Sequence, residues 1–321
     1  MTSSSARKVV LWSSLAALVL LAVAAIVVWS WRDDLPDPIA SHWGAGSAPD
    51  GFSSPGVFVL AIAVMVVVLC ALFGAIGWHW GSSAATRRMA AASSVWIGGF
   101  GACLLVFTLG PQRGLDDATL ARLPGWALAA TLLLPLVPAV VAALLVPGDR
   151  HAPATGPVAA DAARIALAGG ERAVWIRRAD GGTGLVVGAI AIAGLVLLAV
   201  ALRQWALLAA PVLLAVVFAA MFGFTVRVDA TGLTVRSLVG WPGTHIPADE
   251  VERASVTEVR PFRQFGGWGW RVGRGGRVGV VLRAGDALLV ERTGGRSFVV
   301  TVDDAATGAA LLNTLADRAR P

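Results

Sequence analysis

The residues best suited to chemistry lie in one short polar stretch between two long apolar segments. His42 is followed by Trp43, and two acidic residues, Asp37 and Asp50, stand on either side of them. A histidine titrates near neutral pH, and a carboxylate can accept its hydrogen bond. These four residues therefore define a candidate ligand-binding site for a peptide, a metal ion or a proton. The competing hypothesis is structural, with His42 and Trp43 packing the stretch onto neighbouring helix ends.

The stretch that carries these residues, 32–53, has the features of an ordered loop. It holds 22 residues, and loops of that length are usually either functional or disordered. Pro36 and Pro38 force extended backbone on the residues before them, 49–51 (Pro-Asp-Gly) predicts a turn, and 54–55 (Ser-Pro) predicts a capped helix start. A metal is disfavoured because one histidine and two aspartates lack the spacing of a ligand set, and no cofactor is predicted.

The elements that must hold this stretch in place are long apolar segments. The chain of 321 residues is 56% hydrophobic with a mean hydropathy of +0.73, far more apolar than a soluble domain of this length. A helix crosses a bilayer with about 20 apolar residues. Segments of that kind are 9–31, 56–80, 89–110, 126–146, 184–202 and 205–224. The sequence therefore predicts an α-helical integral membrane protein with six transmembrane helices.

Basic residues predict the orientation of these helices. The connections on the side of the N-terminus carry nine Lys and Arg residues, and those on the other side carry four. Because positively charged connections stay in the cytoplasm, both termini are predicted to be cytoplasmic and 32–53 to face outward. The first segment is too long for a signal-peptide core, so we expect it to be retained.

Several function classes are disfavoured by what the spans lack. No Asp, Glu, Lys or Arg lies well inside any of them, whereas ion-coupled transporters and intramembrane proteases place ionisable groups there. Lys8 is the only lysine, which excludes a Gly-Lys-Ser/Thr phosphate loop. We therefore predict a protein that is not an enzyme. Transport through a helix broken at Pro135 or Pro138 remains an alternative.

The tail after Phe224 changes to short alternating runs separated by glycines, which predict a β-rich domain. A final helix is expected to bury Gly308, Leu311, Leu312 and Leu315 on one face. Antiparallel strands closed by one C-terminal helix have the order of a pleckstrin-homology-like barrel. The tail carries 13 basic and 10 acidic residues, too small an excess to favour nucleic-acid binding.

One arginine-rich stretch of the tail, 265–276, also contains Trp268 and Trp270. Arginines interleaved with tryptophans suit contact with anionic lipid headgroups. The predicted lipid-contact residues are Arg271, Arg274 and Arg277. The alternative is a flexible hairpin loop of the barrel.

Two resemblances extend these predictions. The loop Leu-Pro-Asp-Pro-Ile-Ala-Ser-His-Trp-Gly at 35–44, with Gly46 and Pro-Asp-Gly-Phe-Ser at 49–53, resembles the signature of a bacterial domain of unknown function. That domain also occurs in immunity membrane proteins of the sporulation-delaying toxin system. The resemblance implies a multi-helix membrane protein with toxin protection or signal reception, and it brings no catalytic residues.

The second half resembles a bacterial module in which a membrane hairpin carries a cytoplasmic pleckstrin-homology-like domain, preceded here by 170–175 (Gly-Glu-Arg-Ala-Val-Trp).

The expected organisation is a four-helix membrane domain (1–150), a cytoplasmic linker (151–183), a transmembrane hairpin (184–224) and a cytoplasmic pleckstrin-homology-like domain (225–321). We expect a multi-pass protein of the bacterial cytoplasmic membrane that senses an extracellular peptide or toxin at 32–54. Its other expected partners are membrane lipids and a cytoplasmic protein. The alternative function is a transporter or an envelope-maintenance factor.

Overall fold

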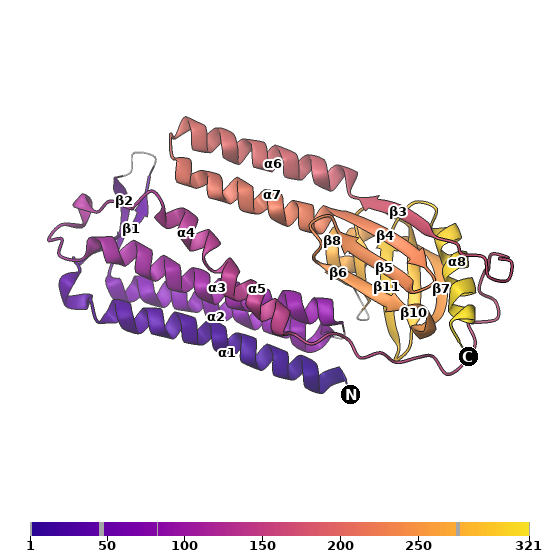
Figure 1. Cartoon of the computed structure of the whole chain (residues 1–321). Coiled ribbons are helices and arrows are strands. Elements are labelled where there is room, and N and C mark those ends of the chain that lie inside the picture. The colour runs from indigo at the N-terminus through magenta and orange to yellow at the C-terminus, as the bar shows by residue number, and fades with distance from the viewer. Residues whose placement is uncertain (1, 45–47, 82, 274–276, 321) are drawn as a thin grey trace. The chain divides into compact units, whose positions relative to one another are not determined.

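The computed structural model describes residues 2–44, 48–81, 83–273 and 277–320, which form two compact units (Figure 1). Unit 1 comprises Met1–Pro147 and Ala191–Leu213, and unit 2 comprises Gly148–Ile190 and Leu214–Pro321. Unit 1 is helical except for one small sheet. Unit 2 contains two larger sheets and the C-terminal helix.

Within the described residues, six helical segments are long and apolar enough to cross a membrane, as the sequence predicted. The chain is therefore a multi-pass membrane protein. The helices are α1 (Thr2–Trp29), α2 (Pro55–Trp80), α3 (Ala84–Leu109), α4 (Ala127–Leu133) with α5 (Leu136–Leu145), α6 (Gly182–Ala201), and the turn η4 (Trp205–Leu208) with α7 (Ala209–Phe222). The predicted start of α2 is confirmed, because the Ser54 side chain caps it and proline is its first residue.

The central helix of unit 1 is α3. Half of the most apolar part of α3 is buried inside the protein, whereas the buried share of the other five spans is 28% or less. A Cβ atom on Gly98 would lie 2.5 Å from Cα of Ala17 in α1, and one on Gly101 would lie 2.5 Å from Cγ2 of Val66 in α2. Glycine is required at both positions because α1 and α2 approach the α3 backbone so closely.

The fourth span consists of two short helices, where a single segment was predicted. Pro135 lies between α4 and α5 and packs against Gly99 of α3. Proline interrupts a helix because it lacks an N–H group and clashes with the preceding turn. The indole nitrogen of Trp96 donates a hydrogen bond to the carbonyl oxygen of Leu132, next to the break (3.2 Å). Pro138 falls in the first turn of α5, where proline is tolerated.

The two sheets of unit 2 confirm a β-rich domain. One has the order β3-β4-β5-β6 and is antiparallel throughout; the other has the order β7-β10-β11-β9-β8, with β9 and β11 parallel. The strands are β3 (Trp175–Asp180), β4 (Gly223–Asp229), β5 (Gly232–Ser237), β6 (Gly243–Pro247), β7 (Val251–Val259), β8 (Gly269–Val272), β9 (Val278–Val281), β10 (Gly285–Arg292) and β11 (Arg296–Thr301). Among the described residues neither sheet closes on itself, so a closed barrel is not seen.

The C-terminal helix, α8 (Ala305–Arg318), packs onto this unit with the predicted face. Leu311, Leu312 and Leu315 are all buried, and Leu312 is fully so. A Cβ atom on Gly308 would lie 3.0 Å from the ring of Trp175, which is buried at the start of β3. Trp175, the last residue of the segment predicted to lead into the hairpin, therefore belongs to the core of unit 2.

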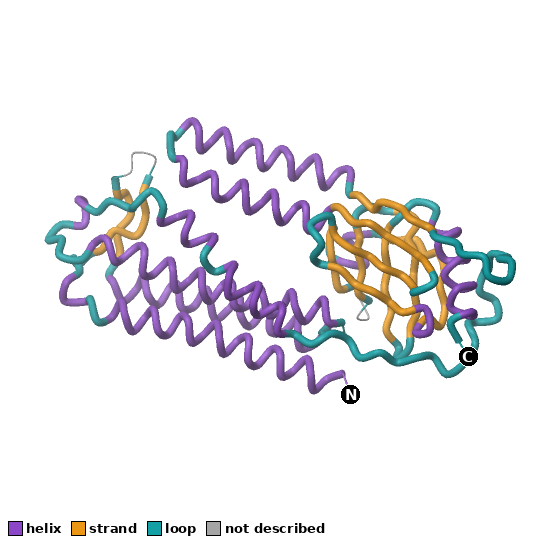
Figure 2. The backbone as a smooth tube through the Cα atoms, viewed as in Figure 1, coloured by secondary structure: helices purple, strands orange, loops and turns teal. Residues whose placement is uncertain are grey.

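Residues 149–171, most of which were expected to form a linker, lie along unit 2 as an extended strap (Figure 2). On one side the strap follows β7 and the residues before it. The amide of Ala154 donates to the carbonyl oxygen of Asp249 (2.8 Å), and that of Ala159 donates to the carbonyl oxygen of Glu252 (3.2 Å). The strap is therefore held by backbone hydrogen bonds that do not depend on its side chains.

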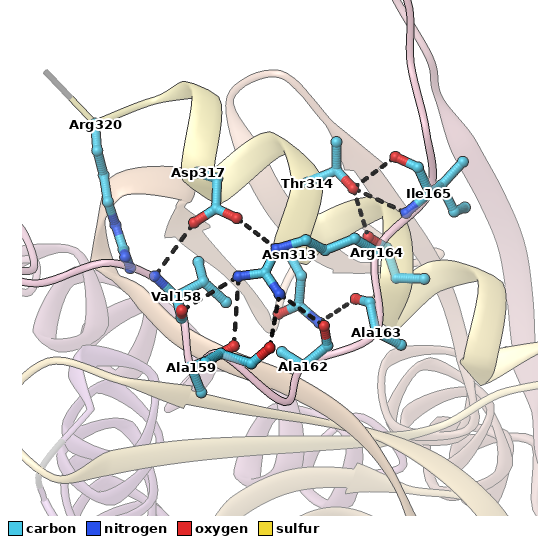
Figure 3. Close-up of polar contacts among 12 residues, drawn as sticks. Val158, Ala159, Ala162, Ala163, Arg164, Ile165, Asn313, Thr314, Asp317 and Arg320 are labelled. Carbon is cyan, nitrogen blue, oxygen red and sulfur yellow. Dashed lines mark hydrogen bonds and ion pairs between the residues drawn. The ribbon is translucent and has the colours of Figure 1, made fainter.

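On its other side the strap is held by polar residues of α8 (Figure 3). Asp317 accepts hydrogen bonds from the amide of Val158 (3.2 Å) and from Nε of Arg164 (2.6 Å). The Thr314 hydroxyl contacts both backbone groups of Ile165 at 2.9 Å. The last turns of α8 thus supply hydrogen-bond donors and acceptors to the strap, which has no regular secondary structure of its own.

The buried amide of Asn313 joins three elements of unit 2. Its Oδ1 accepts from the amide of Ala254 in β7 (2.7 Å), and its Nδ2 donates to the carbonyl oxygens of Ala254 (2.8 Å) and Ala163 (2.9 Å). Asn313 is fully buried, so each of these contacts replaces a hydrogen bond to water. One side chain thereby links α8, β7 and the strap.

A buried charge cluster fixes the start of the strap. Glu250, whose side chain is 2% exposed, accepts from the amide of Ala152 (2.8 Å) and lies 3.3 Å from Arg292 and 3.4 Å from Arg296. Burial, together with the neighbouring charge of Arg296, lowers the pKa of Arg292, whereas Glu250 opposes this shift. A buried carboxylate is tolerated here because two guanidinium groups and a backbone amide surround it.

Candidate functional site

The stretch predicted as a loop contains a small antiparallel hairpin, β1 (Ile39–Trp43) and β2 (Pro49–Ser53). The predicted turn at 49–51 is wrong, because these residues lie in β2. Residues 45–47, which include Gly46, lie outside the described part of the chain. The pairing skips one residue on each strand, Ser41 and Asp50, and such bulges redirect side chains. Asp50 is therefore placed beside His42, which pairs with Gly51.

His42 and Asp50 form the one close pair among the four predicted ligand residues. Nδ1 of His42 lies 2.5 Å from Oδ1 of Asp50, and the two side chains are 73% and 54% exposed. A carboxylate can only accept, so Nδ1 carries the hydrogen and donates it. Nε2 is then the nitrogen that remains to accept a hydrogen bond or a proton from a ligand.

Two glycines leave the space that this pair occupies. A Cβ atom on Gly44 would lie 2.6 Å from Oδ2 of Asp50, and one on Gly51 would lie 2.9 Å from Cβ of His42. Real Cβ atoms do not approach so closely, so a larger residue at either position would displace the carboxylate or the imidazole. Both glycines lie in the stretch that carries the first resemblance.

Gln112, which sequence analysis missed, joins the hairpin to the end of α3. Gln112 is fully buried at the end of η2 (Gly110–Gln112), the turn that follows α3. Its Oε1 accepts from the amide of Ala40 and its Nε2 donates to the carbonyl oxygens of Ala40 and Thr108, all at 2.8 Å. The side chain thus pairs with β1 as a neighbouring strand would. The signal for it was a lone amide side chain at the end of an apolar span.

Trp43 packs the hairpin against the connection between α3 and α4. Its indole nitrogen donates to the carbonyl oxygen of Ala121 (3.3 Å). It also covers a small apolar cluster that includes Ala40, Ala118 and Ala121, all buried. Trp43 is half-buried and acts here as the packing hypothesis predicted. The pair of His42 and Asp50 is instead exposed.

The structure does not bring Asp37 into this pair. Asp37 is exposed and precedes a cis peptide bond to Pro38. Among the described residues, neither a hydrogen bond nor an ion pair joins it to His42 or Asp50. Nor do the described residues contain a group of three His, Cys, Asp or Glu side chains that could hold a metal ion.

The predicted lipid-contact residues fall in unit 2. Arg271 in β8 and Arg277 before β9 are exposed, whereas Arg274 lies outside the described residues. Nε of Arg271 donates to the carbonyl oxygen of Trp268 (2.6 Å). Trp270 belongs to the core, since it is 6% exposed and packs near Phe298 with ring centres 5.7 Å apart. Of the two tryptophans in this stretch, Trp268 is therefore the one with exposed surface, since it is half-buried.

The fold defines a multi-pass membrane protein with a β-rich unit, and its first helices carry a recognisable signature. Residues 18–67 match the family described as Domain of unknown function (DUF1648). The matched part holds the C-terminal part of α1 from residue 18 on, the whole β1–β2 hairpin and the first half of α2. No curated protein and no solved structure matches the chain.

Proposed function

We propose that the chain is a non-enzymatic receptor of the bacterial cytoplasmic membrane that binds an extracellular ligand at the β1–β2 hairpin. The observation that carries this proposal is the His42–Asp50 pair, exposed on a hairpin whose backbone is fixed by buried Gln112. A preordered site binds with a smaller loss of entropy than a flexible loop does. Exposed polar pairs on rigid supports suit recognition, whereas buried pairs mainly serve the fold.

A cationic peptide is the ligand class that fits this hairpin best. Asp37 and Asp50 are exposed, and the connections predicted on that side carry six aspartates against four arginines. A surface with net negative charge attracts positively charged ligands and speeds their association. An immunity-type protein would capture a basic toxin in this way, with both chain termini in the cytoplasm.

Unit 2 is proposed as the cytoplasmic output of this receptor, with a pleckstrin-homology-like fold. Two sheets followed by a packed C-terminal helix support that class. A ligand that prefers one hairpin arrangement would shift the protein only by its difference in affinity for the two states. Membrane lipids and a cytoplasmic protein are the partners proposed for this unit.

Transport is the second candidate function, and one observation favours it. The fourth span is interrupted at Pro135, and broken helices form substrate sites in many transporters. A transporter should show substrate-dependent flux in proteoliposomes. A receptor should show none under the same conditions.

The receptor proposal is tested with variants in a protection or signalling assay in the native host, at matched membrane abundance. His42→Ala and Asp50→Asn should each weaken the response roughly tenfold or more, since hydrogen bonds to charged groups contribute about 1.5–3 kcal/mol. Asp33→Asn is the matched control, because it removes the same charge from the same segment without touching the pair. Full activity of both test variants in folded protein would exclude the pair from function.

A further inference from the structure

Two loops of unit 2 lie beside the last turn of α7. The Ser237 hydroxyl donates to the carbonyl oxygen of Ala219 (3.4 Å), and the amide of Leu238 donates to the carbonyl oxygen of Gly223 (3.0 Å). From the other sheet, a Cβ atom on Gly269 would lie 3.9 Å from Cβ of Met221. The β5–β6 loop and the segment before β8 therefore both reach the end of this helix.

Both loops expose large apolar side chains. The β5–β6 loop carries Leu238, Val239 and Trp241, which are 62%, 52% and 39% exposed. The segment between β7 and β8 carries Phe262, which is 65% exposed and packs edge-on against Trp268 with ring centres 4.9 Å apart. Apolar residues gathered in this way on a water-facing surface mark an interaction site.

The depth of these side chains follows from the helix that they adjoin. The sixth candidate span ends at Phe222, and β4 continues from it at Gly223 without a connecting loop. The end of a spanning helix lies at the level of the lipid headgroups. Ser237 contacts α7 at Ala219, about one helical turn before that end. The β5–β6 loop therefore lies at the membrane interface.

Exposed arginines flank the apolar side chains. Arg178 and Arg236 pair in register with Thr225 on either side of it, about 7 Å along the strand from Gly223. Arg263 follows Phe262, and Arg271 is in β8, next to the same segment. Asp180 is the acidic residue at the register of Gly223. Positive charge at this level is complementary to anionic phospholipids.

We propose that these two loops form a membrane-docking rim whose partner is an anionic phospholipid bilayer. The rim consists of 237–242 and 261–268, with its apolar side chains inserted into the leaflet at which α7 ends. Arg178, Arg236, Arg263 and Arg271 contact the lipid phosphates. The rim gives a surface to the lipid contact already proposed for unit 2. It does not rest on the receptor function proposed for the hairpin, and it holds whichever side of the membrane unit 2 occupies.

The test uses the full chain in nanodiscs, with a fluorescent label on Val239→Cys and a quencher on the shallow part of the lipid acyl chains. Cys70 and Cys103 are first replaced by alanine, so that the label has a single position. Ala230→Cys is the matched control, because it is exposed at the opposite end of the same β4–β5 hairpin. Most of the fluorescence should be lost at position 239, and none at position 230.

The lipid charge is tested with the same label. Quenching at position 239 should be stronger in nanodiscs with phosphatidylglycerol than in nanodiscs of phosphatidylcholine alone. Arg236→Gln with Arg263→Gln should lower it part of the way to the phosphatidylcholine level, because Arg178 and Arg271 remain. Equal quenching at positions 239 and 230 would overturn the membrane-docking rim. Quenching at position 239 that changes neither with lipid charge nor with the arginine substitutions would overturn the assignment to anionic lipids.

Discussion

At the scale of single residues, two buried amides do similar work in the two units. Gln112 satisfies both backbone groups of Ala40, and Asn313 satisfies both backbone groups of Ala254. Both side chains are fully buried. An amide has a donor and an acceptor at the spacing of a peptide group, so it can replace a neighbouring strand.

Replacing Gln112 should loosen the hairpin without unfolding unit 1. Gln112→Ala leaves the buried amide and carbonyl of Ala40 unpaired, and an unsatisfied buried group costs about 1–3 kcal/mol. Hydrogen exchange at the Ala40 amide should therefore become roughly 10- to 100-fold faster. Gln264→Ala, which removes an exposed amide from unit 2, is the control. Unchanged protection of Ala40 would show that Gln112 does not fasten the hairpin.

Sequence reasoning proposed His42 and Asp50, together with Asp37 and Trp43, as ligand residues, but it did not find the side chain that supports their hairpin. His42 and Asp50 were evident because titratable residues are rare in so apolar a chain. Gln112 and Ala40 are 72 positions apart, and no local pattern reports such a contact. The bulge at Asp50 was missed for a related reason, since Pro-Asp-Gly is a common turn sequence and only the pairing with β1 makes it a strand.

At the scale of elements, hydrophobic periodicity and capping residues were sufficient to predict a helix where the local sequence strongly favoured one. The six spans, the cap at Ser54 and the buried face of α8 were all predicted correctly. β3 was missed because four of its six residues are exposed and two of those are arginines, which hides the alternation. The strap could not be predicted, because its contacts are with backbone and side chains far along the chain.

The start of the strap should respond to pH. A hydrogen bond with the Asp249 carboxylate raises the pKa of His151 above its ordinary value of 6.5, although the side chain is largely exposed. A raised folded-state pKa means that the stabilisation is complete below 6.5 and is lost as the pH rises through the raised value. Attachment should therefore weaken as the pH rises above 6.5.

Hydrogen exchange of the amides of Ala152 and Ala154, corrected for the intrinsic pH dependence, measures this effect. Protection should fall with rising pH in the wild type and stay level in His151→Gln. The same pH profile in both proteins would exclude His151 as the titrating group.

At the scale of the whole molecule, the proposed receptor has its hairpin and unit 2 on opposite sides of the membrane. Because basic residues concentrate in the connections on the N-terminal side, a membrane-impermeant thiol reagent should modify Ala48→Cys in intact cells. It should fail to modify Ala230→Cys until the cells are opened. Both positions are exposed, so accessibility within the fold is matched. Labelling of both in intact cells would contradict the topology.

The central claim is that His42 and Asp50 act as one ligand-binding unit, and a double-mutant cycle tests it most directly. The dose for a half-maximal response in the native host is measured for His42→Ala, Asp50→Ala and the double variant, at matched membrane abundance. If the two side chains act through their shared hydrogen bond, each single change should shift the dose roughly tenfold, and the double variant should shift it no further. If the double variant instead shifts the dose roughly a hundredfold, the product of the two single shifts, the side chains make two independent contacts. No shift of the dose in any variant would contradict a role of the pair in binding.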